Sequence, residues 1–308
     1  MSRLDPALAD YLALRRSLGF RLERAGKLLA QFTAYLDAQG ADTVTVEAAL
    51  AWATLPPNGG SRWHAMRLTV VRGFAAHLHG LDPSHELIPA ELLRDRGQRA
   101  TPYLYSDAEV VALMGAAASL RTPFRAATYA TLIGLLAVAG LRVGEAIRLD
   151  RGDLDFREGT LTIRMSKFGK SRLVPLHPTT VTALRRYRGR PDRPRPRIPT
   201  AALFSSSAGT RLRYCVVNRT FLKLVRHAGL RRRSAACRPR LHDLRHTFAV
   251  RTVLDAYRAG LDVGARLPIL STYLGHVSPA ATYWYLSAAP ELLATAGDRL
   301  ERYLGDRP

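Results

Sequence analysis

The side chains best suited to chemistry in this 308-residue chain are cations, imidazoles and a phenol, spread over its C-terminal two-thirds. The candidates are Arg142, Lys167, His242, Arg245, His276 and Tyr285. Guanidinium groups and an imidazole can bind the charge that builds on phosphate oxygens when a phosphodiester is cut. A tyrosine hydroxyl can attack the phosphorus, and a lysine can protonate the leaving oxygen. This set indicates phosphoryl transfer through a phosphotyrosine ester, which conserves the bond energy and requires no ATP.

Local patterns predict how the chain holds the arginines and the lysine. Residues 126–139 form a nearly continuous run of apolar and small residues that ends at Gly140, so we expect a buried helix followed by a turn that carries Arg142. Two β-like runs, at 161–165 and 172–176, flank a six-residue turn and predict a hairpin with Lys167 at its tip.

The remaining candidates lie near the C-terminus. His242 and Arg245 open a predicted helix and lie three residues apart on one face. His276 follows a Leu-Gly pair, and Tyr285 comes nine residues later. Taken singly, each of these side chains could be an ordinary structural residue.

The distribution of charge points to a polyanion as partner. The net charge is +21, with 11 basic and 10 acidic residues up to residue 98 and 35 basic and 15 acidic residues after it. Such a field favours nucleic acid. An arginine-rich composition caused by GC-rich coding DNA is the alternative, but it does not account for the asymmetry between the two parts.

Other function classes lack their signatures. The chain has no Gly-rich phosphate loop and no carboxylate cluster for two-metal catalysis, so we expect no cofactor and no metal. Cys215 and Cys237 make neither a disulfide framework nor a four-ligand zinc site. There is no uncharged apolar run of 18 residues and no signal peptide, so we expect a cytoplasmic protein without a membrane partner.

The chain is long enough for two domains, with an expected boundary between residues 98 and 99. The first domain, 1–98, is predicted to be helical. Its expected helices lie within 5–39 with a break at Gly19, after Thr43 or Thr45, and over 61–78. Residues 92–104 are interpreted as a linker, and Ser106 with Glu109 forms a capping box that opens the second domain, 99–308.

The ordered motifs resemble the tyrosine recombinase (phage integrase) family over about residues 103–290. They are Gly-Leu-Arg142-x-x-Glu145, Lys167 on a hairpin, His242-x-Leu-Arg245-His-Thr-Phe-Ala249, Leu-Gly-His276 and Tyr285. The resemblance implies a mainly α-helical fold with a small β-hairpin or sheet. It also implies a helical, SAM-like core-DNA-binding domain followed by a mixed α/β catalytic domain.

By this resemblance, Tyr285 is the nucleophile, and Arg142, Arg245 and His276 stabilise the pentavalent phosphate. Lys167 is similar to the general acid of the family, and His242 to its general base or tyrosine-orienting residue. Glu145 is similar to an acidic residue that braces Arg142. The expected partner is double-stranded DNA with specific recombination sites, bound by a homotetramer that can include partner recombinases.

Several alternatives stay open. Lys170 lies on the same turn as Lys167, and Tyr283 lies two residues before Tyr285. His246 is interpreted as a residue that packs in the core or supports the catalytic side chains, and Arg231–Arg233 as either a solvated run or a phosphate contact. Phe168 replaces a glycine that is usual in the family's turn, which weakens the expected hairpin geometry.

The motifs do not distinguish the biological roles within the family, because they fit integrases, transposases, resolvases and invertases alike. The stretch 256–272 is longer than the usual link in the family and favours a recombinase of a mobile element. Residues 290–304 fit an amphipathic helix that packs on its own domain or docks into a neighbouring protomer. Type IB topoisomerases, which share a similar residue set, and a non-catalytic DNA-binding protein are the rival classes.

Overall fold

The chain folds as two compact units, Met1–Arg99 and Ala100–Pro308, in the computed structural model. The structure describes residues 4–55, 57, 59–93, 100–165, 169–195 and 200–276. The expected boundary between residues 98 and 99 therefore lies outside the described residues.

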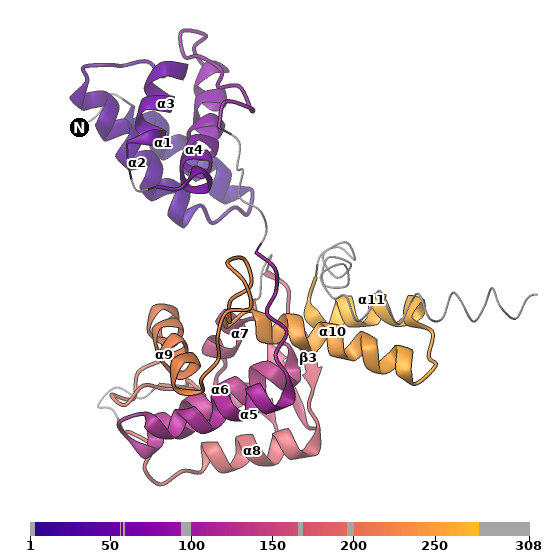
Figure 1. The fold of residues 1–308 in the computed structure, drawn as a ribbon. Coiled ribbons are helices and arrows are strands. Elements are labelled where there is room, and N and C mark those ends of the chain that lie inside the picture. Colours follow the sequence, from indigo (N-terminus) through magenta and orange to yellow (C-terminus); the bar gives the residue numbers. More distant parts are fainter. Residues whose placement is uncertain are drawn as a thin grey trace, which may run out of the picture. The chain divides into compact units, whose positions relative to one another are not determined.

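Helices build the described part of the first unit (Figure 1): α1 (Asp5–Ser17), α2 (Glu23–Ala38), α3 (Val46–Thr54) and α4 (Ser61–His79). The predicted break separates α1 from α2, where Leu22 takes a positive φ of 46°. Thr45 caps α3 by accepting a hydrogen bond of 3.1 Å from the N–H of Ala48. The apolar faces of the helices meet in one core, in which the rings of Phe32 and Trp52 lie 5.2 Å apart.

The second unit is also mainly helical. Its described helices are α5 (Asp107–Ala116), α6 (Pro123–Ala139), α7 (Val143–Arg148), α8 (Pro178–Arg188), α9 (Tyr214–His227), α10 (Asp243–Arg258) and α11 (Val263–Leu274), with short 3₁₀ turns at Ala117–Ser119 and Arg151–Asp153. The predicted capping box at Ser106 is present and opens α5. Helix α6 lies inside the larger core and packs against α5, α8 and α10, which explains its nearly continuous apolar sequence.

The predicted hairpin is part of a small antiparallel sheet. Within the described residues the sheet has three strands in the order β1 (Leu154–Asp155), β2 (Thr160–Ile163) and β3 (Arg172–Pro175). Leu161 pairs with Val174 and Ile163 with Arg172, so apolar side chains of β2 and β3 reach the core while Arg172 begins β3 at the end of the ladder. The fold is mainly α with one small sheet, as the sequence predicts.

Helices α10 and α11 form an antiparallel pair beside the sheet (Figure 1). They enclose a separate small core that includes Val253, Leu267 and Leu270. The stretch that looked like a long link is mostly α11 itself, and only residues 259–262 connect the two helices. Among the described residues, no helix combines the length and the apolar character needed to cross a bilayer.

Candidate active site

Arg142 lies at the predicted turn between α6 and α7. Gly140 ends α6 with a φ of +56°, and a Cβ at this position would lie 2.4 Å from the ring of Phe248, so the turn requires glycine. The backbone N–H of Arg142 donates to Oε2 of Glu145 (3.0 Å), and its Nη1 donates to Oε1 (2.8 Å). The Arg142 side chain is 24% exposed and the Glu145 side chain 1% exposed. Glu145 therefore holds the guanidinium while part of it stays open to solvent.

Arg172 supplies the second half of the support for Glu145. Its Nη1 and Nη2 donate to the two carboxylate oxygens at 3.1 and 2.9 Å, a bidentate pair. Burial by itself would raise the pKa of Glu145, but the hydrogen bonds and charge of Arg172, followed by the backbone and side-chain hydrogen bonds of Arg142, outweigh it and bring the pKa down to about 2. Glu145 is thus an anion that two arginines share.

Arg245 is almost completely buried at the start of α10, with 1% of its surface exposed. Its Nη1 donates to the carbonyl of Gly140 at 2.7 Å, and its Nη2 donates to the carbonyl of Leu274 at 2.6 Å. Nη2 also lies 2.9 Å from Nε2 of His276. A guanidinium can only donate, so Nε2 is the acceptor here and the ring proton of neutral His276 lies on Nδ1.

The C-terminal end of α11 brings these arginines together. Gly275 adopts a φ of +68°, and the N–H groups of Gly275 and His276 satisfy earlier carbonyls of the helix, including that of Ser271. The next three carbonyls each accept from a different guanidinium. Arg172 Nε donates to Tyr273 (2.7 Å), Arg245 Nη2 to Leu274 (2.6 Å) and Arg142 Nη2 to Gly275 (3.0 Å). Cations are favoured at this end of a helix, because its carbonyls carry partial negative charge.

The histidines of the site are neutral near pH 7. Desolvation, followed by the charges of Arg245 and Arg142, lowers the pKa of His276 to about 4. The ring of His242 keeps access to solvent, yet desolvation by the surrounding protein and the same two arginines lower its pKa to about 4 as well. His246 is buried, with its ring edge-on to that of His242 at 4.9 Å. Desolvation lowers the pKa of His246 to about 3.

An acidic residue that the sequence analysis passed over supports the start of α10. Asp243 is fully buried and accepts from Nε and Nη2 of Arg240 at 3.0 and 2.8 Å. Arg240 precedes the helix and Asp243 is its first residue, so the pair fixes the first turn from which Arg245 extends. His242 itself makes no side-chain cap to α10.

The other predicted site residues fall into two groups. Lys167 and Tyr285, with the rival Tyr283 and with Phe168, lie outside the described residues. Lys170 and the run Arg231–Arg233 are exposed. Arg233 nevertheless has protein partners, because its Nη2 donates to the carbonyl of Leu104 at 2.9 Å and its guanidinium lies 4.3 Å from the ring of Tyr103. No cluster of three or more His, Cys, Asp or Glu residues suited to a metal ion occurs in the part of the chain that the structure describes.

A family model decides the classification of this chain. The model described as "Phage integrase family" matches residues 104–291, a span that contains every predicted site residue. The chain belongs to the phage integrase family of tyrosine recombinases. The enzyme is accordingly a tyrosine-type site-specific recombinase.

Individual relatives extend the similarity over the full chain. "Putative integrase/recombinase y4rB" of Sinorhizobium fredii is 44% identical over 313 residues, which cover 100% of both chains. "Tyrosine recombinase XerD" of Mycobacterium tuberculosis is 35% identical over 156 residues, or 50% of this chain and 46% of that protein. The solved structure of the Tn1549 transposon integrase in complex with transposon right end DNA covers 98% of this chain and 99% of its own, with a TM-score of 0.66 and 17% identity, and therefore supports the fold.

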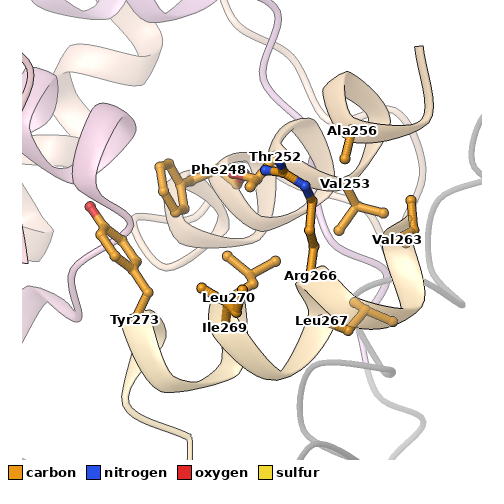
Figure 2. Close-up of a pocket in the computed structure, with 10 residues that line it drawn as sticks. All are labelled: Phe248, Thr252, Val253, Ala256, Val263, Arg266, Leu267, Ile269, Leu270 and Tyr273. Carbon is orange, nitrogen blue, oxygen red and sulfur yellow. The ribbon is translucent and has the colours of Figure 1, made fainter. Parts of the chain in front are cut away.

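The recombinase also has an apolar cavity that the sequence did not predict. It lies between α10 and α11, has a volume of about 260 Å³ and is lined mainly by apolar side chains (Figure 2). Leu267 and Leu270 form its floor, whereas Ile269 on its rim is 68% exposed. Figure 2 shows Phe248 and Tyr273 at one end of the cavity, and the ring of Tyr273 stacks on that of Phe248 at 5.5 Å. Tyr273 also accepts the Arg172 hydrogen bond through its carbonyl, so the cavity adjoins the arginine cluster.

Proposed function

We propose that this recombinase cuts and rejoins double-stranded DNA at specific sites through a 3′-phosphotyrosine intermediate, with Tyr285 as the nucleophile. The observation that carries the proposal is the meeting of Arg142, Arg245 and His276 at the end of α11. Two guanidinium groups held by backbone carbonyls form a rigid anion site, because little reorganisation is needed when charge develops on the phosphate.

The phosphate is bound chiefly by hydrogen bonds from Arg142 in this proposal. A guanidinium carries five N–H groups, and the contacts of Arg142 to Glu145 and Gly275 use one each on Nη1 and Nη2. Three N–H groups then remain for non-bridging phosphate oxygens. Arg245, which is buried behind the site, contributes charge and fixes His276, whose neutral ring can donate its proton to a phosphate oxygen.

The covalent step follows from this arrangement. The Tyr285 oxygen forms a bond to phosphorus, the bond from phosphorus to the 5′-oxygen breaks, and the tyrosine proton passes to neutral His242. The pKa of about 4 keeps His242 unprotonated near neutral pH and able to accept that proton. Lys167 donates a proton to the leaving 5′-oxygen. Attack by a 5′-hydroxyl of a second strand on the phosphotyrosine reverses these transfers and joins the new strands.

Covalent trapping tests the proposal. A nicked substrate that loses its 5′-hydroxyl fragment after cleavage should accumulate a protein–DNA adduct with the wild-type enzyme and none with Tyr285→Phe. Tyr283→Phe is the matched control and should form the adduct. Lys167→Ala should slow cleavage about 10²-fold or more, whereas the exposed Lys170→Ala should not. An adduct that persists in Tyr285→Phe and disappears in Tyr283→Phe would assign the nucleophile to Tyr283.

The two units are proposed to divide the work. The second unit carries the chemistry, and residues 1–98 act as a core-DNA-binding domain, so that both units bind the recombination site. The enzyme is proposed to act in the cytoplasm. Arg67 of the first unit is buried against Trp52, which excludes it as a DNA contact and leaves exposed arginines such as Arg21 and Arg24. Photo-crosslinking of the full chain to a cognate site should yield peptides from both units. Crosslinks confined to residues after 99 would contradict this division.

The biological role proposed is movement of a mobile element. Identity of 44% to a protein named as an integrase/recombinase runs over the whole chain, whereas the similarity to the XerD protein covers half of it. Amplification across the joined ends of an excised circle, in cells that carry the gene with its flanking DNA, should detect a product that depends on Tyr285. Detection of chromosome-dimer resolution without such a circle would oppose this role.

Assembly into a homotetramer on two DNA sites is proposed to use the α10–α11 cavity. The C-terminal sequence offers apolar positions at helical spacing, including Leu292, Leu293 and Leu300, which match the chemistry of the cavity. We infer that this segment of one protomer docks into the cavity of the next. Deletion of 290–308 and, independently, Ile269→Glu should both weaken tetramer formation on paired sites while binding of a single site persists. Unchanged tetramers in both variants would refute the docking.

A further inference from the structure

We propose that Arg172 is a positioning residue of this recombinase, which holds Arg142 and His276 in the geometry that binds the scissile phosphate without itself touching DNA. This inference rests on the proposed function, because it deepens the description of the same site. Arg172 lies on β3, far in sequence from both residues, and its three hydrogen bonds all end on groups that hold Arg142 or His276 in place.

The first link runs through Glu145. The buried carboxylate receives four hydrogen bonds, two from Arg142 and two from Arg172. Because Arg172 neutralises the carboxylate, Arg142 can hold Glu145 with one Nη1 hydrogen and keep other N–H groups for phosphate. If Arg172 were lost, Arg142 would be the sole cation against a buried anion and would be drawn towards a bidentate pair with it. The phosphate would then lose donors although Arg142 is still present.

The second link runs through α11. Arg172 Nε donates to the carbonyl of Tyr273, three residues before His276, and ties the start of β3 to the last turn of the helix. A Cβ at Gly275 would lie 2.8 Å from Arg172 Nη1, so the guanidinium packs directly on the turn that presents His276. Arg172 therefore sets the distance between the Arg142 turn and the His276 turn.

The geometry argues against a direct contact of Arg172 with DNA. Its side chain is 12% exposed, half the exposure of Arg142 at 24%, and each of its three nitrogens already donates to the protein. These contacts need a planar group with donors on three nitrogens. A lysine ammonium has one nitrogen and cannot span the carboxylate and the carbonyl together, so Arg172→Lys keeps the charge but loses the alignment.

The test measures single-turnover cleavage at saturating DNA by Arg172→Lys and by a structural control, Arg211→Lys. Arg211 similarly joins a carboxylate to backbone carbonyls, with Nη2 at 2.5 Å from Asp150 and Nη1 at 2.9 Å from the carbonyl of Ile147, but it lies outside the site. We expect cleavage to fall about 10²-fold in Arg172→Lys and to stay near wild type in Arg211→Lys. Equal cleavage by wild type and Arg172→Lys would overturn the inference.

A second substrate separates phosphate binding from proton donation, because Arg172 follows Lys167 by only five residues in the sequence and could act through it. When sulfur replaces the bridging 5′-oxygen, the leaving thiolate needs no proton, since thiols have a pKa near 8.5. Cleavage by Lys167→Ala should recover on this substrate, and cleavage by Arg172→Lys should stay low. Recovery of Arg172→Lys to the same degree would show that Arg172 acts through the general acid and would refute the role proposed here.

A double variant keeps the inference testable if Arg172→Lys folds poorly. Glu145→Gln removes the buried charge that Arg172 neutralises, so the pair Glu145→Gln/Arg172→Lys should fold and should cut little more slowly than Glu145→Gln alone. Fully additive losses would contradict action through Glu145. A wild-type enzyme that forms no adduct would refute the proposed function and this inference with it, whereas the outcomes above refute the inference alone.

Discussion

Each unit of the recombinase buries an arginine, and the two arginines have different surroundings. Arg67 on α4 is 6% exposed, donates from Nη2 to the carbonyl of Trp52 at 2.7 Å, and places its guanidinium 3.6 Å from the Trp52 ring centroid. Arg245 on α10 is 1% exposed and contacts two separate segments, the turn after α6 at Gly140 and the end of α11 at Leu274 and His276. Arg67 fastens one helix to its neighbour, whereas Arg245 joins the segments that carry the candidate site.

The comparison shows that burial of a cation is not in itself a sign of function. The sign is the convergence of several cations, one buried and the others partly exposed, on a point where one of them stays accessible. Around Arg245, the accessible group is Arg142, and the shared anchor is the end of α11. Around Arg67, the hydrogen bond and the cation–π contact are both made with Trp52. Substitutions matched between the two units, or between a glycine inside and one outside the site, should therefore have unequal effects on cleavage.

The largest effect is expected from Arg245→Met beside Arg67→Met. Loss of Arg245 removes a charge from the phosphate site and releases His276, so cleavage should fall about 10³-fold or more. Arg67→Met removes the shorter of two hydrogen bonds to the Trp52 carbonyl, which keeps the one from the N–H of Leu55 at 3.4 Å, and should cost about 1–2 kcal/mol of stability with little change in cleavage per folded molecule. Single-turnover cleavage and thermal melting measure the two effects. Comparable loss of cleavage in both variants, at temperatures where both are folded, would contradict the assignment of a structural role to Arg67 and a functional role to Arg245.

A smaller effect is expected from Gly275→Ala beside Gly229→Ala. Both glycines have a positive φ, of 68° and 70°, so alanine should destabilise each variant by about 1 kcal/mol. A Cβ at Gly275 would also lie 2.8 Å from Arg172 Nη1, whereas nothing lies within 4 Å at Gly229. Cleavage should therefore fall about 10-fold in Gly275→Ala only, since the clash displaces the anchor of Arg142 and His276. Equal cleavage in the two variants would show that this turn tolerates displacement.

The sequence predicted the helices, turns and strands that carry the site better than the contacts between its side chains. Local signals located the α6–α7 turn at Gly140, the capping box at Ser106 and the hairpin at β2 and β3, because each depends on residues close together in the chain. The assignment to the tyrosine recombinases is confirmed by the family model. The roles of Lys167 and Tyr285 stay predictions, since both residues lie outside the described part of the chain.

Arg172 escaped the sequence analysis for a physical reason. Its partners, Glu145 and the carbonyl of Tyr273, lie 27 and 101 residues away, and no periodicity links a strand to a helix end over such separations. Every residue has a backbone carbonyl, so the sequence does not show which carbonyl accepts a hydrogen bond. One signal was available: Arg172 opens an otherwise apolar strand, and a charged residue at a half-buried strand position needs a partner. The α10–α11 cavity was missed because it depends on the packing of two helices.

The smallest effect concerns the response of the second unit to acid. The pKa of His276 is about 4 and that of buried His246 about 3, both below the value of about 6.5 in an unfolded chain. As the pH falls below about 6.5, these histidines bind protons in the unfolded chain but not in the folded unit, so the free energy of unfolding decreases. Glu145, with a pKa of about 2, also lowers the free energy of unfolding as the pH falls, but only below about pH 4.5.

At pH 5 this linkage amounts to about 2 kcal/mol for His246, or a Tm shift of roughly 4 °C. Melting curves at several pH values should therefore show a decline in Tm between about pH 7 and pH 5 that is shallower in His246→Gln than in wild type. The variant's absolute stability is irrelevant, because the slope alone reports the proton uptake. Parallel curves for wild type and His246→Gln would mean that His246 is protonated in the folded enzyme, which would contradict the neutral histidine cluster around Arg245.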